Sequence, residues 1–349
     1  MRPSQAIATL VSVIKHNEEV GLRNGPAIDY IRVGLLGEPG VGKSSIIGQA
    51  AELAGYKSQT FLASMRDPTD LSGGMVESGK YCDFLRPRFL PEGDEKIVFN
   101  MDEMGQASMP MQNACANLHL DRRAGTHDLG RFTTVIACWN PPKSRAGSTR
   151  LPSQYLNRLL QIELKPSKED FTEHAQVVGA DPLIPYFIDW KGEAALHDFR
   201  ADRDVNATPR SWMAVNQTLK LGLPAIVEAE AIAGQVGMDH AAEFNAFRKL
   251  KSEITNIRDI FADPVKATVS EKRELQYMTL MVLQSMTTRQ NVQNAVTYAS
   301  RMTKELEVFF VRGLLRRDVA AKKIGGKVEG FEQTETYRKW LESGNVRFL

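Results

Sequence analysis

The chain has 349 residues, 42% hydrophobic and 25% charged, which is ordinary for a globular protein and long enough for two compact units. Its 44 Lys and Arg against 42 Asp and Glu leave a net charge of +2, which favours neither a polyanion nor a membrane surface as a general partner. Three scattered cysteines, no apolar run of about 18 residues and no secretory pattern predict a cytoplasmic protein without a transmembrane helix.

Three regular elements are expected near the start of the chain. Met1 to Asn24 carries apolar side chains at helical spacing and runs into Gly25-Pro26, which predicts a leading helix. Ile31 to Leu36 is an apolar run typical of a buried strand. A helical pattern then starts at about Ser44 and extends to Leu53.

Between that strand and that helix lies the phosphate-loop pattern Gly-x-x-x-x-Gly-Lys-Ser. Glycines let successive N–H groups point inward, and the helix offers its unpaired N–H groups and positive dipole end to the same anion. Lys43 would reach the β- and γ-phosphates, and Ser44 would offer its hydroxyl to Mg²⁺. A chance match in a glycine-rich turn is the alternative, which the strand and helix on either side disfavour. The sequence therefore predicts a nucleoside triphosphate site at Gly37, Glu38, Pro39, Gly40, Val41, Gly42, Lys43, Ser44 and Ser45.

A second motif follows where the mostly apolar run from Lys96 ends in Asp102-Glu103. Ligands of an open parallel sheet gather at the carboxyl ends of its strands, so these acids should lie beside the phosphate loop. Asp102 would hold Mg²⁺, mainly through its water shell, and Glu103 would act as the general base on the attacking water. A solvated strand end is the other interpretation, and the phosphate loop upstream favours the catalytic one.

Another buried strand is expected from Phe132 to Cys138, and it ends at Trp139-Asn140-Pro141. Proline stops the strand and leaves the Asn140 amide at the same edge of the sheet as the acids. An amide there can orient water against the γ-phosphate without adding charge. The alternative for an asparagine before proline is a simple turn former.

The remaining segments are assigned by pattern. Gln106 to Leu120 predicts a helix, Arg122 to Gly130 a turn or hairpin, and Leu160 to Leu164 a strand. After Pro166 the strand signals cease. Thr208-Pro209-Arg210 looks like a helix start with Thr as the cap, which puts Arg210 on the first helical turn.

The order of these motifs resembles that of a AAA+ ATPase. The resemblance covers Ile31 to Leu221 and rests on the phosphate loop, Asp102-Glu103, Asn140, Asn157-Arg158 and Pro209-Arg210 in that order. It implies ATP as the nucleotide, Mg²⁺ as the metal, and an α/β P-loop NTPase core with a parallel sheet sandwiched by helices. It further implies that Asn140 is the sensor-one residue, Arg158 the arginine finger for the neighbouring subunit, and Arg210 the sensor-two arginine, in cis or in trans.

Within the AAA+ proteins, two stretches are similar to the MoxR and magnesium-chelatase group. Arg66 to Leu90 looks like the helix-two insert of that group, and Asp102 to Ala107 with the turn Leu120 to Arg123 also matches it. This resemblance implies a homo-oligomeric ring, expected to be a hexamer, that remodels a protein client. A partner with a von Willebrand factor A domain is the expected kind of client.

A physical argument supports the finger apart from the resemblance. Phosphoryl transfer builds charge on the equatorial oxygens, and an arginine supplied by a neighbour accelerates turnover by about 10³–10⁵ in known cases. Arg158 is the candidate, and Arg150 is the second choice. A structural salt bridge is the alternative role for Arg158.

We therefore expect an AAA+ nucleotide-binding core over residues 1–165, an α-helical lid over 166–242 and a helical C-terminal extension over 243–349. The leading hypothesis is Mg²⁺-dependent ATP hydrolysis that remodels or activates a partner protein. A DNA-associated AAA+ motor or loader is one alternative, and a nucleotide-gated binding switch is another. The DNA alternative draws on a basic cluster, for which a solvated face is the favoured interpretation: Arg312, Arg316, Arg317, Lys322, Lys323 and Lys327.

Overall fold

The computed structural model describes residues 1–144, 149–250, 253–323 and 329–345. The chain divides into two compact units. The first comprises Met1–Ser167, Phe199–Asp204 and Thr208–Arg210, and the second comprises the described residues of Lys168–Asp198, Val205–Ala207 and Ser211–Leu349.

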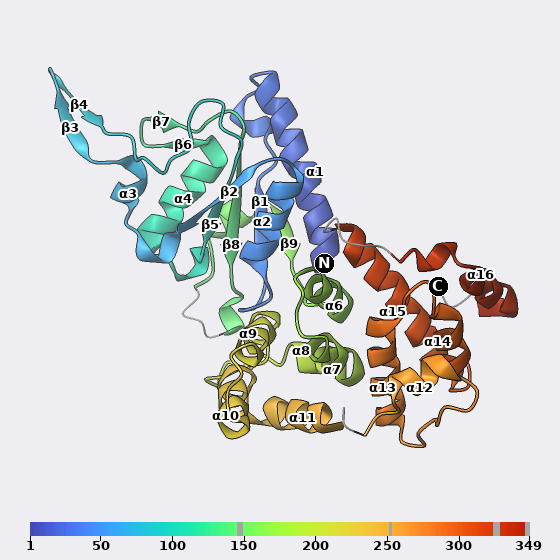
Figure 1. Ribbon diagram of the computed structural model, residues 1–349. Helices are drawn as coiled ribbons and strands as arrows, with labels where there is room; N and C mark the ends of the chain where they lie inside the picture. Colours follow the sequence, from blue (N-terminus) through green and yellow to red (C-terminus); the bar gives the residue numbers. More distant parts are fainter. Residues whose placement is uncertain (145–148, 251–252, 324–328, 346–349) are drawn as a thin grey trace. The chain divides into compact units, whose positions relative to one another are not determined.

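A five-stranded parallel sheet is the centre of the first unit, with the strand order β2-β5-β8-β1-β9 (Figure 1). The chain therefore visits the strands out of spatial order, and the strand before the phosphate loop lies between β8 and β9. The three inner strands are almost wholly buried, as expected for a parallel sheet covered on both faces. The strands are β1 (Val33–Leu36), β2 (Lys57–Leu62), β5 (Ile97–Asp102), β8 (Thr133–Trp139) and β9 (Leu160–Glu163).

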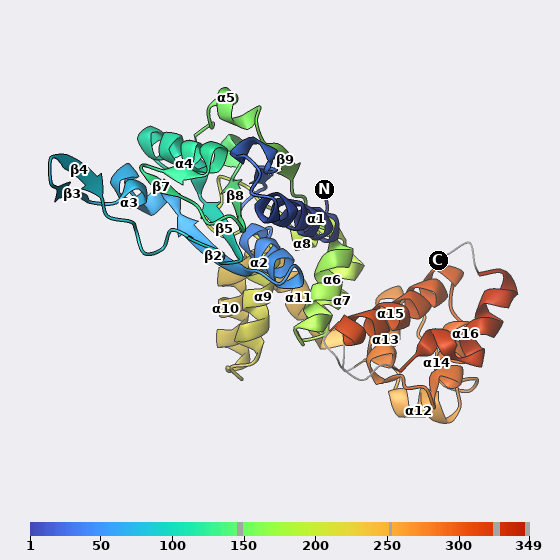
Figure 2. The ribbon, with the colours of Figure 1, turned by 90° about the horizontal axis from the view of Figure 1, so that it is seen from above.

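Helices cover both faces of this sheet, as Figure 2 shows from above. Helices α1 (Pro3–Leu22) and α2 (Lys43–Leu53) form one hydrophobic core with alternate residues of the strands, such as Val98 and Ile136. Helix α4 (Met109–Asp121) forms a second core with residues of the opposite parity, such as Phe99 and Val135. The period-two alternation of side chains along each strand thus supplies both faces.

Smaller elements complete the first unit. Two antiparallel hairpins are formed by β3 (Met75–Ser78) with β4 (Tyr81–Phe84), and by β6 (Arg123–Ala124) with β7 (His127–Asp128). The first hairpin extends away from the sheet (Figure 1). The short helices are η1 (Ala27–Asp29), η2 (Ala63–Met65), α3 (Pro68–Ser72), η3 (Met104–Gln106), η4 (Pro142–Ser144) and α5 (Ser153–Leu156).

The second unit is helical in its described part apart from an isolated β-bridge. One of its cores is built around Phe187, Trp212 and Phe244, and another around Tyr298, Phe310 and Trp340. Its helices are α6 (Lys168–Val177), α7 (Leu183–Lys191), α8 (Glu193–Leu196), α9 (Pro209–Leu219, whose first turn belongs to the first unit), α10 (Ala225–Val236), α11 (Met238–Lys249), α12 (Ile257–Ala262), α13 (Arg273–Met286), α14 (Val292–Ala299), α15 (Lys304–Lys323), η6 (Phe331–Gln333), α16 (Glu335–Trp340) and η7 (Leu341–Asn345).

The fold class predicted from the sequence is confirmed in its architecture: an α/β core with a parallel sheet between helices is followed by helical segments. The division predicted between 242 and 243 falls inside α11, whose Phe244 and Phe247 pack in the same core as Trp212. Within the described ranges, no helix is both long enough and apolar enough to cross a membrane.

Candidate functional site

The phosphate-loop sequence forms the connection between β1 and α2. Gly40 and Gly42 have φ values of 77° and 95°, in the left-handed region that favours glycine. A Cβ atom at Gly40 would lie 2.6 Å from the hydroxyl of Thr208, whereas one at Gly42 would meet open space. Both glycines are therefore required by backbone conformation, and Gly40 also by the close approach of Thr208.

The side chain of Lys43 is folded into the loop. Its ammonium donates to the carbonyl oxygens of Gly37 at 2.8 Å and Glu38 at 3.2 Å, and to Oδ1 of Asn140 at 2.6 Å. Asn140 follows β8, which is hydrogen-bonded to β1, and this adjacency explains the contact. The structure thus brings the predicted lysine and the predicted amide together.

Ser44 contacts the first of the two acids. Its hydroxyl donates to Oδ2 of Asp102 at 2.7 Å, across 58 residues of sequence. Asp102 is the last residue of β5, and its other carboxylate oxygen accepts the backbone N–H of Glu103 at 2.9 Å. The carboxyl end of β5 therefore lies beside the first turn of α2, as the sequence predicts.

Glu103 has a partner that the sequence analysis missed. The hydroxyl of Ser64, in η2 just after β2, donates to Oε2 of Glu103. Glu103 itself has a φ of 57°, which is uncommon for a residue with a side chain. Strand β2 pairs in parallel with β5, so a polar residue just after β2 should lie close to a residue just after β5. This is the sequence signal that could have identified Ser64.

Arg210 lies next to its own phosphate loop. Its backbone N–H donates to the carbonyl oxygen of Gly40 at 3.2 Å, and Thr208 packs on Gly40. The segment Thr208–Arg210 belongs to the same compact unit as the loop. The side chain of Arg210 is exposed at the first turn of α9.

Arg158 lies at the opposite end of the sheet from the loop. Strand β9 pairs in parallel with β1 so that Leu160 is opposite Val33 and Glu163 is opposite Leu36. Arg158 precedes that strand and the loop follows Leu36, so at least the length of β1, about 13 Å, separates them. Among the described residues, the exposed Arg158 guanidinium has no hydrogen-bond or ion-pair partner.

Arg150, the second finger candidate, lies nearer the acids. The backbone N–H of Thr149 donates to the carbonyl oxygen of Gly105 at 2.6 Å, and Gly105 follows Glu103 by two residues. Arg150 is exposed. The two arginines therefore lie at different ends of the sheet.

The remaining loop residues have ordinary environments. Val41 is buried in the core with α1 and α2, and the Ser45 hydroxyl accepts from the amide of Gln49 at 3.2 Å. Glu38 and Pro39 complete the turn between β1 and α2. Any contact of these residues with a nucleotide stays a prediction.

Burial sets the electrostatics of the loop. It lowers the pKa of the Lys43 ammonium, and the positive charge of Arg210 acts in the same direction. The carboxylates of Asp102 and Glu103 oppose this shift. Opposite charges thus surround the lysine at short range, which suits a site that has to receive a polyanion and a cation together.

The described residues include no group of three or more His, Cys, Asp or Glu side chains that could hold a metal ion by themselves. The paired oxygens of Ser44 and Asp102 are hard ligands of the kind that Mg²⁺ prefers, and Mg²⁺ at such sites usually keeps waters and binds substrate phosphates. These two side chains therefore fit a magnesium ion that is held jointly with a nucleotide.

No family model matches the chain. Among solved structures, it is similar to the Holliday junction branch migration motor RuvB of Thermotoga maritima, with 14% identity, a TM-score of 0.35 and coverage of 75% of this chain and 76% of that chain. It is also similar to NtrX of Brucella abortus in complex with ADP, with 15% identity, a TM-score of 0.33 and coverage of 99% and 68%. Similarity at this level does not decide what this chain binds or does.

Proposed function

We propose that this chain is an AAA+ ATPase that hydrolyses ATP with Mg²⁺ and uses the turnover to remodel or activate a partner protein. One observation carries the proposal. Residues from four separate strand ends meet at the phosphate loop, with Ser44 bonded to Asp102, Lys43 bonded to Asn140, and Ser64 bonded to Glu103. This set of side chains is what phosphoryl transfer to water requires.

Each residue has a defined task in this proposal. The loop backbone from Gly37 to Gly42 binds the phosphates, and Lys43 exchanges its carbonyl partners for phosphate oxygens. Asn140, released from Lys43, orients water against the γ-phosphate. Glu103 accepts a proton from that water on the carboxylate oxygen that the hydrogen bond from Ser64 leaves available.

The metal has one task. A Mg²⁺ ion bound by Ser44 and through water by Asp102 would neutralise charge on the phosphate oxygens. Arg210, at the start of α9, is placed to add a positive charge from the same subunit, since its backbone already contacts Gly40. We infer that Arg210 acts in cis.

We further propose that the subunits form a ring, with a hexamer as the expected size. Arg158 cannot serve its own loop from the far end of β9, and its guanidinium is exposed and unpaired among the described residues. A neighbouring subunit is therefore its expected place of action. The protein client, for which a von Willebrand factor A domain is the expected type, rests on the resemblance to the MoxR group alone.

The test is a single substitution with a matched control. Glu103→Gln should lower ATP turnover by at least about 100-fold, because an amide cannot accept the proton of the attacking water. ATP binding, measured by calorimetry, should be retained. Glu95→Gln, an exposed acid just before β5, should leave turnover unchanged. Turnover by Glu103→Gln at the parent rate would contradict the mechanism.

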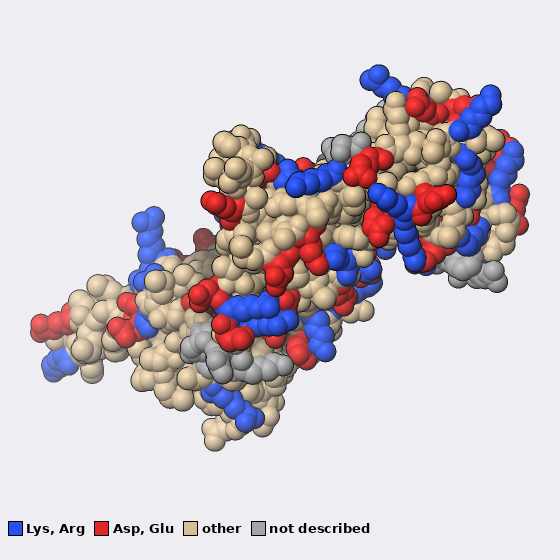
Figure 3. Space-filling view, turned by 90° about the horizontal axis from the view of Figure 1, so that it is seen from below, with Lys and Arg blue, Asp and Glu red and all other residues tan. Residues whose placement is uncertain are grey.

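The described part of α15 does not favour the DNA alternative. Arg316 pairs with Asp189 at 3.7 Å, Lys322 pairs with Glu332 at 3.0 Å, and Arg317 donates to the carbonyl oxygens of Gln284 and Thr287. Lys327 lies outside the described residues, as does the side chain of Lys323. Figure 3 shows Lys and Arg interspersed with Asp and Glu on the face that it displays, rather than a continuous basic surface there.

A slow nucleotide switch is also disfavoured, since a switch does not need Glu103, Asn140 and Arg158 together.

A further inference from the structure

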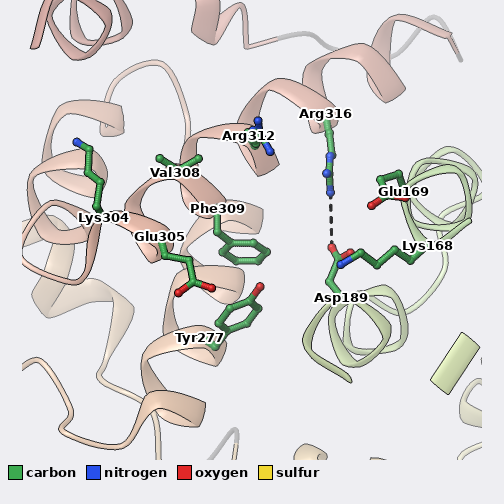
Figure 4. A pocket seen from close by; sticks show the side chains of 10 residues that line it. All are labelled: Lys168, Glu169, Asp189, Tyr277, Lys304, Glu305, Val308, Phe309, Arg312 and Arg316. Atoms are coloured by element: carbon green, nitrogen blue, oxygen red, sulfur yellow. Dashed lines mark ion pairs between the residues drawn. The ribbon is translucent and has the colours of Figure 1, made fainter. Parts of the chain in front are cut away.

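The second unit contains a pocket that the proposed ATPase does not use. It has a volume of about 470 Å³ and is enclosed by α6, α7, α13 and α15 (Figure 4). This volume is within the range of sites that bind small molecules. Two features of its lining, an aromatic wall and an excess of basic over acidic side chains, define what it could bind.

The aromatic wall consists of Tyr277 and Phe309. Their rings lie with centroids 4.3 Å apart and an interplanar angle of 31°, and Figure 4 shows them side by side in the centre of the pocket. Both are partly buried and pack against the core of the unit. Such a pair offers a rigid apolar surface against which a flat ring can pack.

The acidic side chains of the pocket are already engaged. Asp189 is paired with Arg316 at 3.7 Å, and Glu305 is paired with Arg273 at 2.5 Å. Glu169 also has an interaction of its own. These carboxylates are therefore poor candidates for binding an added cation.

Two basic side chains of the pocket are not engaged in the same way. Lys304 is paired with Glu307 at 2.7 Å, whereas Arg312 forms no ion pair or hydrogen bond with any described residue. Lys168 forms no hydrogen bond or close ion pair with a described residue either, although its charge acts on the Asp189 carboxylate, which Arg316 already pairs. They lie on two different elements, α6 and α15. Figure 4 shows Lys168 extending toward Asp189, and Arg312 on the helix that carries Phe309 and Arg316.

We propose that this pocket binds a small aromatic anion, with its ring against Tyr277 and Phe309 and its phosphate or carboxylate group between Arg312 and Lys168. An arginine and a lysine on opposite walls can bind one anionic group with charge-assisted hydrogen bonds. A purely apolar ligand would leave Arg312 without a counter-charge and Lys168 with only the Asp189 carboxylate that Arg316 also pairs, and a cationic ligand would face the repulsion of both cations. The ligand would connect α15 to α6 within the second unit.

Saturation-transfer NMR with the full chain tests this chemistry directly. The probes are phenyl phosphate and phenylacetate as the two anionic sources, with benzyl alcohol and benzylamine as neutral and cationic analogues. At least one anionic probe should bind about tenfold more tightly than both analogues, because a hydrogen bond between charged groups is worth about that factor. The anionic probe that binds more tightly shows whether the natural ligand carries a phosphate or a carboxylate.

Variants separate this pocket from other sites. Arg312→Gln and Lys168→Gln should each weaken binding of the preferred probe about tenfold, with an unchanged circular dichroism spectrum. Arg258→Gln, an exposed arginine of α12 in the same unit, is the matched control and should bind as the parent does. Lys43→Ala should also bind as the parent does, which rules out the phosphate loop as the location.

Two results would overturn the proposal. One is that neither anionic probe binds, or that benzyl alcohol or benzylamine binds as tightly as the anionic probes do. The other is loss of probe binding in Lys43→Ala with retention in Arg312→Gln, which would assign the signal to the phosphate loop. Neither result bears on hydrolysis, which the Glu103→Gln measurement tests separately.

Discussion

At the scale of single residues, the hydrogen bonds of Lys43 indicate how the phosphate loop can receive an anion. An ammonium has three donors, and here the carbonyl oxygens of Gly37 and Glu38 and the amide oxygen of Asn140 accept from all three. A phosphate that takes the place of these acceptors gains a charge-assisted hydrogen bond. The same exchange frees the Asn140 amide from Lys43. Phosphate binding is therefore coupled to the release of this amide, which can then turn toward the γ-phosphate.

Ser64 gives the first prediction at this scale. The Ser64→Ala variant should raise the basal turnover of ATP by up to about fivefold, because the hydrogen bond of about 1 kcal/mol from Ser64 stabilises the charged Glu103 carboxylate, and this stabilisation is lost when Glu103 takes the proton of the attacking water. Steady-state kinetics should show the effect in kcat, with KM for ATP unchanged. A fall in kcat of the size seen in Glu103→Gln would mean instead that Ser64 positions the carboxylate for catalysis.

The two glycines with positive φ, Gly40 and Gly42, give a second prediction. Gly42→Ala should lower the free energy of unfolding by about 1–2 kcal/mol, because the new side chain meets open space but adopts a left-handed conformation. Gly40→Ala should cost more, since its Cβ would also lie 2.6 Å from the Thr208 hydroxyl. Urea denaturation of the two variants measures the difference. Equal losses would show that Thr208 moves aside freely.

The sequence predicts that these side chains lie close together because most of them belong to motifs, and the hydrogen bonds of Lys43 with Asn140 and of Ser44 with Asp102 agree with that proximity. The loop, Asp102, Glu103 and Asn140 each follow an apolar strand, and the carboxyl ends of parallel strands meet at one edge. Ser64 was missed because a serine beyond a half-exposed strand is common in turns. The bonds of Lys43 with Gly37 and Glu38 were also missed, since they form only within a loop of this curvature.

At the scale of elements, buried strands were easier to predict than their neighbours. Apolar runs predicted the ends of β1, β5 and β8 to within about two residues. They do not predict the strand order β2-β5-β8-β1-β9, because that order depends on pairing between strands far apart in the sequence. Hairpin β3–β4 lies within Arg66 to Leu90, which the sequence indicates only through its resemblance to a helix-two insert. Its side chains are mostly exposed, so burial leaves no alternating pattern there.

The connection between α4 and α5 gives the third prediction. His119 of α4 is buried, and its Nδ1 lies 2.7 Å from the hydroxyl of Tyr155 in α5. Burial lowers the pKa of His119 to about 3. The hydrogen-bonding effect of the Val135 backbone opposes this shift, and the positive charges of Arg32 and Arg122 add to it. The imidazole is therefore neutral in the folded protein.

Acid should weaken the fold through this histidine. The folded pKa is below the unfolded value of 6.5, so the unfolded state binds more protons as pH falls from 6.5 toward 3, and stability is lost in that window. Between pH 7 and pH 5 the parent should lose about 2 kcal/mol of unfolding free energy more than His119→Gln does. Urea denaturation at the two pH values measures this. An equal loss in both proteins would show that folding does not lower the pKa of His119.

At the scale of the whole molecule, the sequence predicts an α/β core followed by helices, and the structure contains both. The sequence divides the helical part at 242/243, whereas compactness groups its described residues into one unit. Helical periodicity cannot locate such a division, because a helix such as α11 shows the same apolar stripe on either side of it. The sequence of a single chain also does not show how its subunits assemble, so assembly has to be tested by mixing variants.

Mixing two inactive variants tests whether Arg158 acts in a neighbouring subunit. Glu103→Gln and Arg158→Ala should each lose most ATP turnover, the second because the finger is absent. If one subunit supplies Glu103 and the next supplies Arg158, then random assembly from equal amounts restores about a quarter of the sites, since each requirement is met half the time. Turnover should therefore rise to about a quarter of the parent rate when the variants are mixed before assembly with ATP. If the mixture stays inactive while one of Glu103→Gln with Arg150→Ala recovers, the finger is Arg150. If neither mixture recovers, the arginines do not act across a subunit boundary.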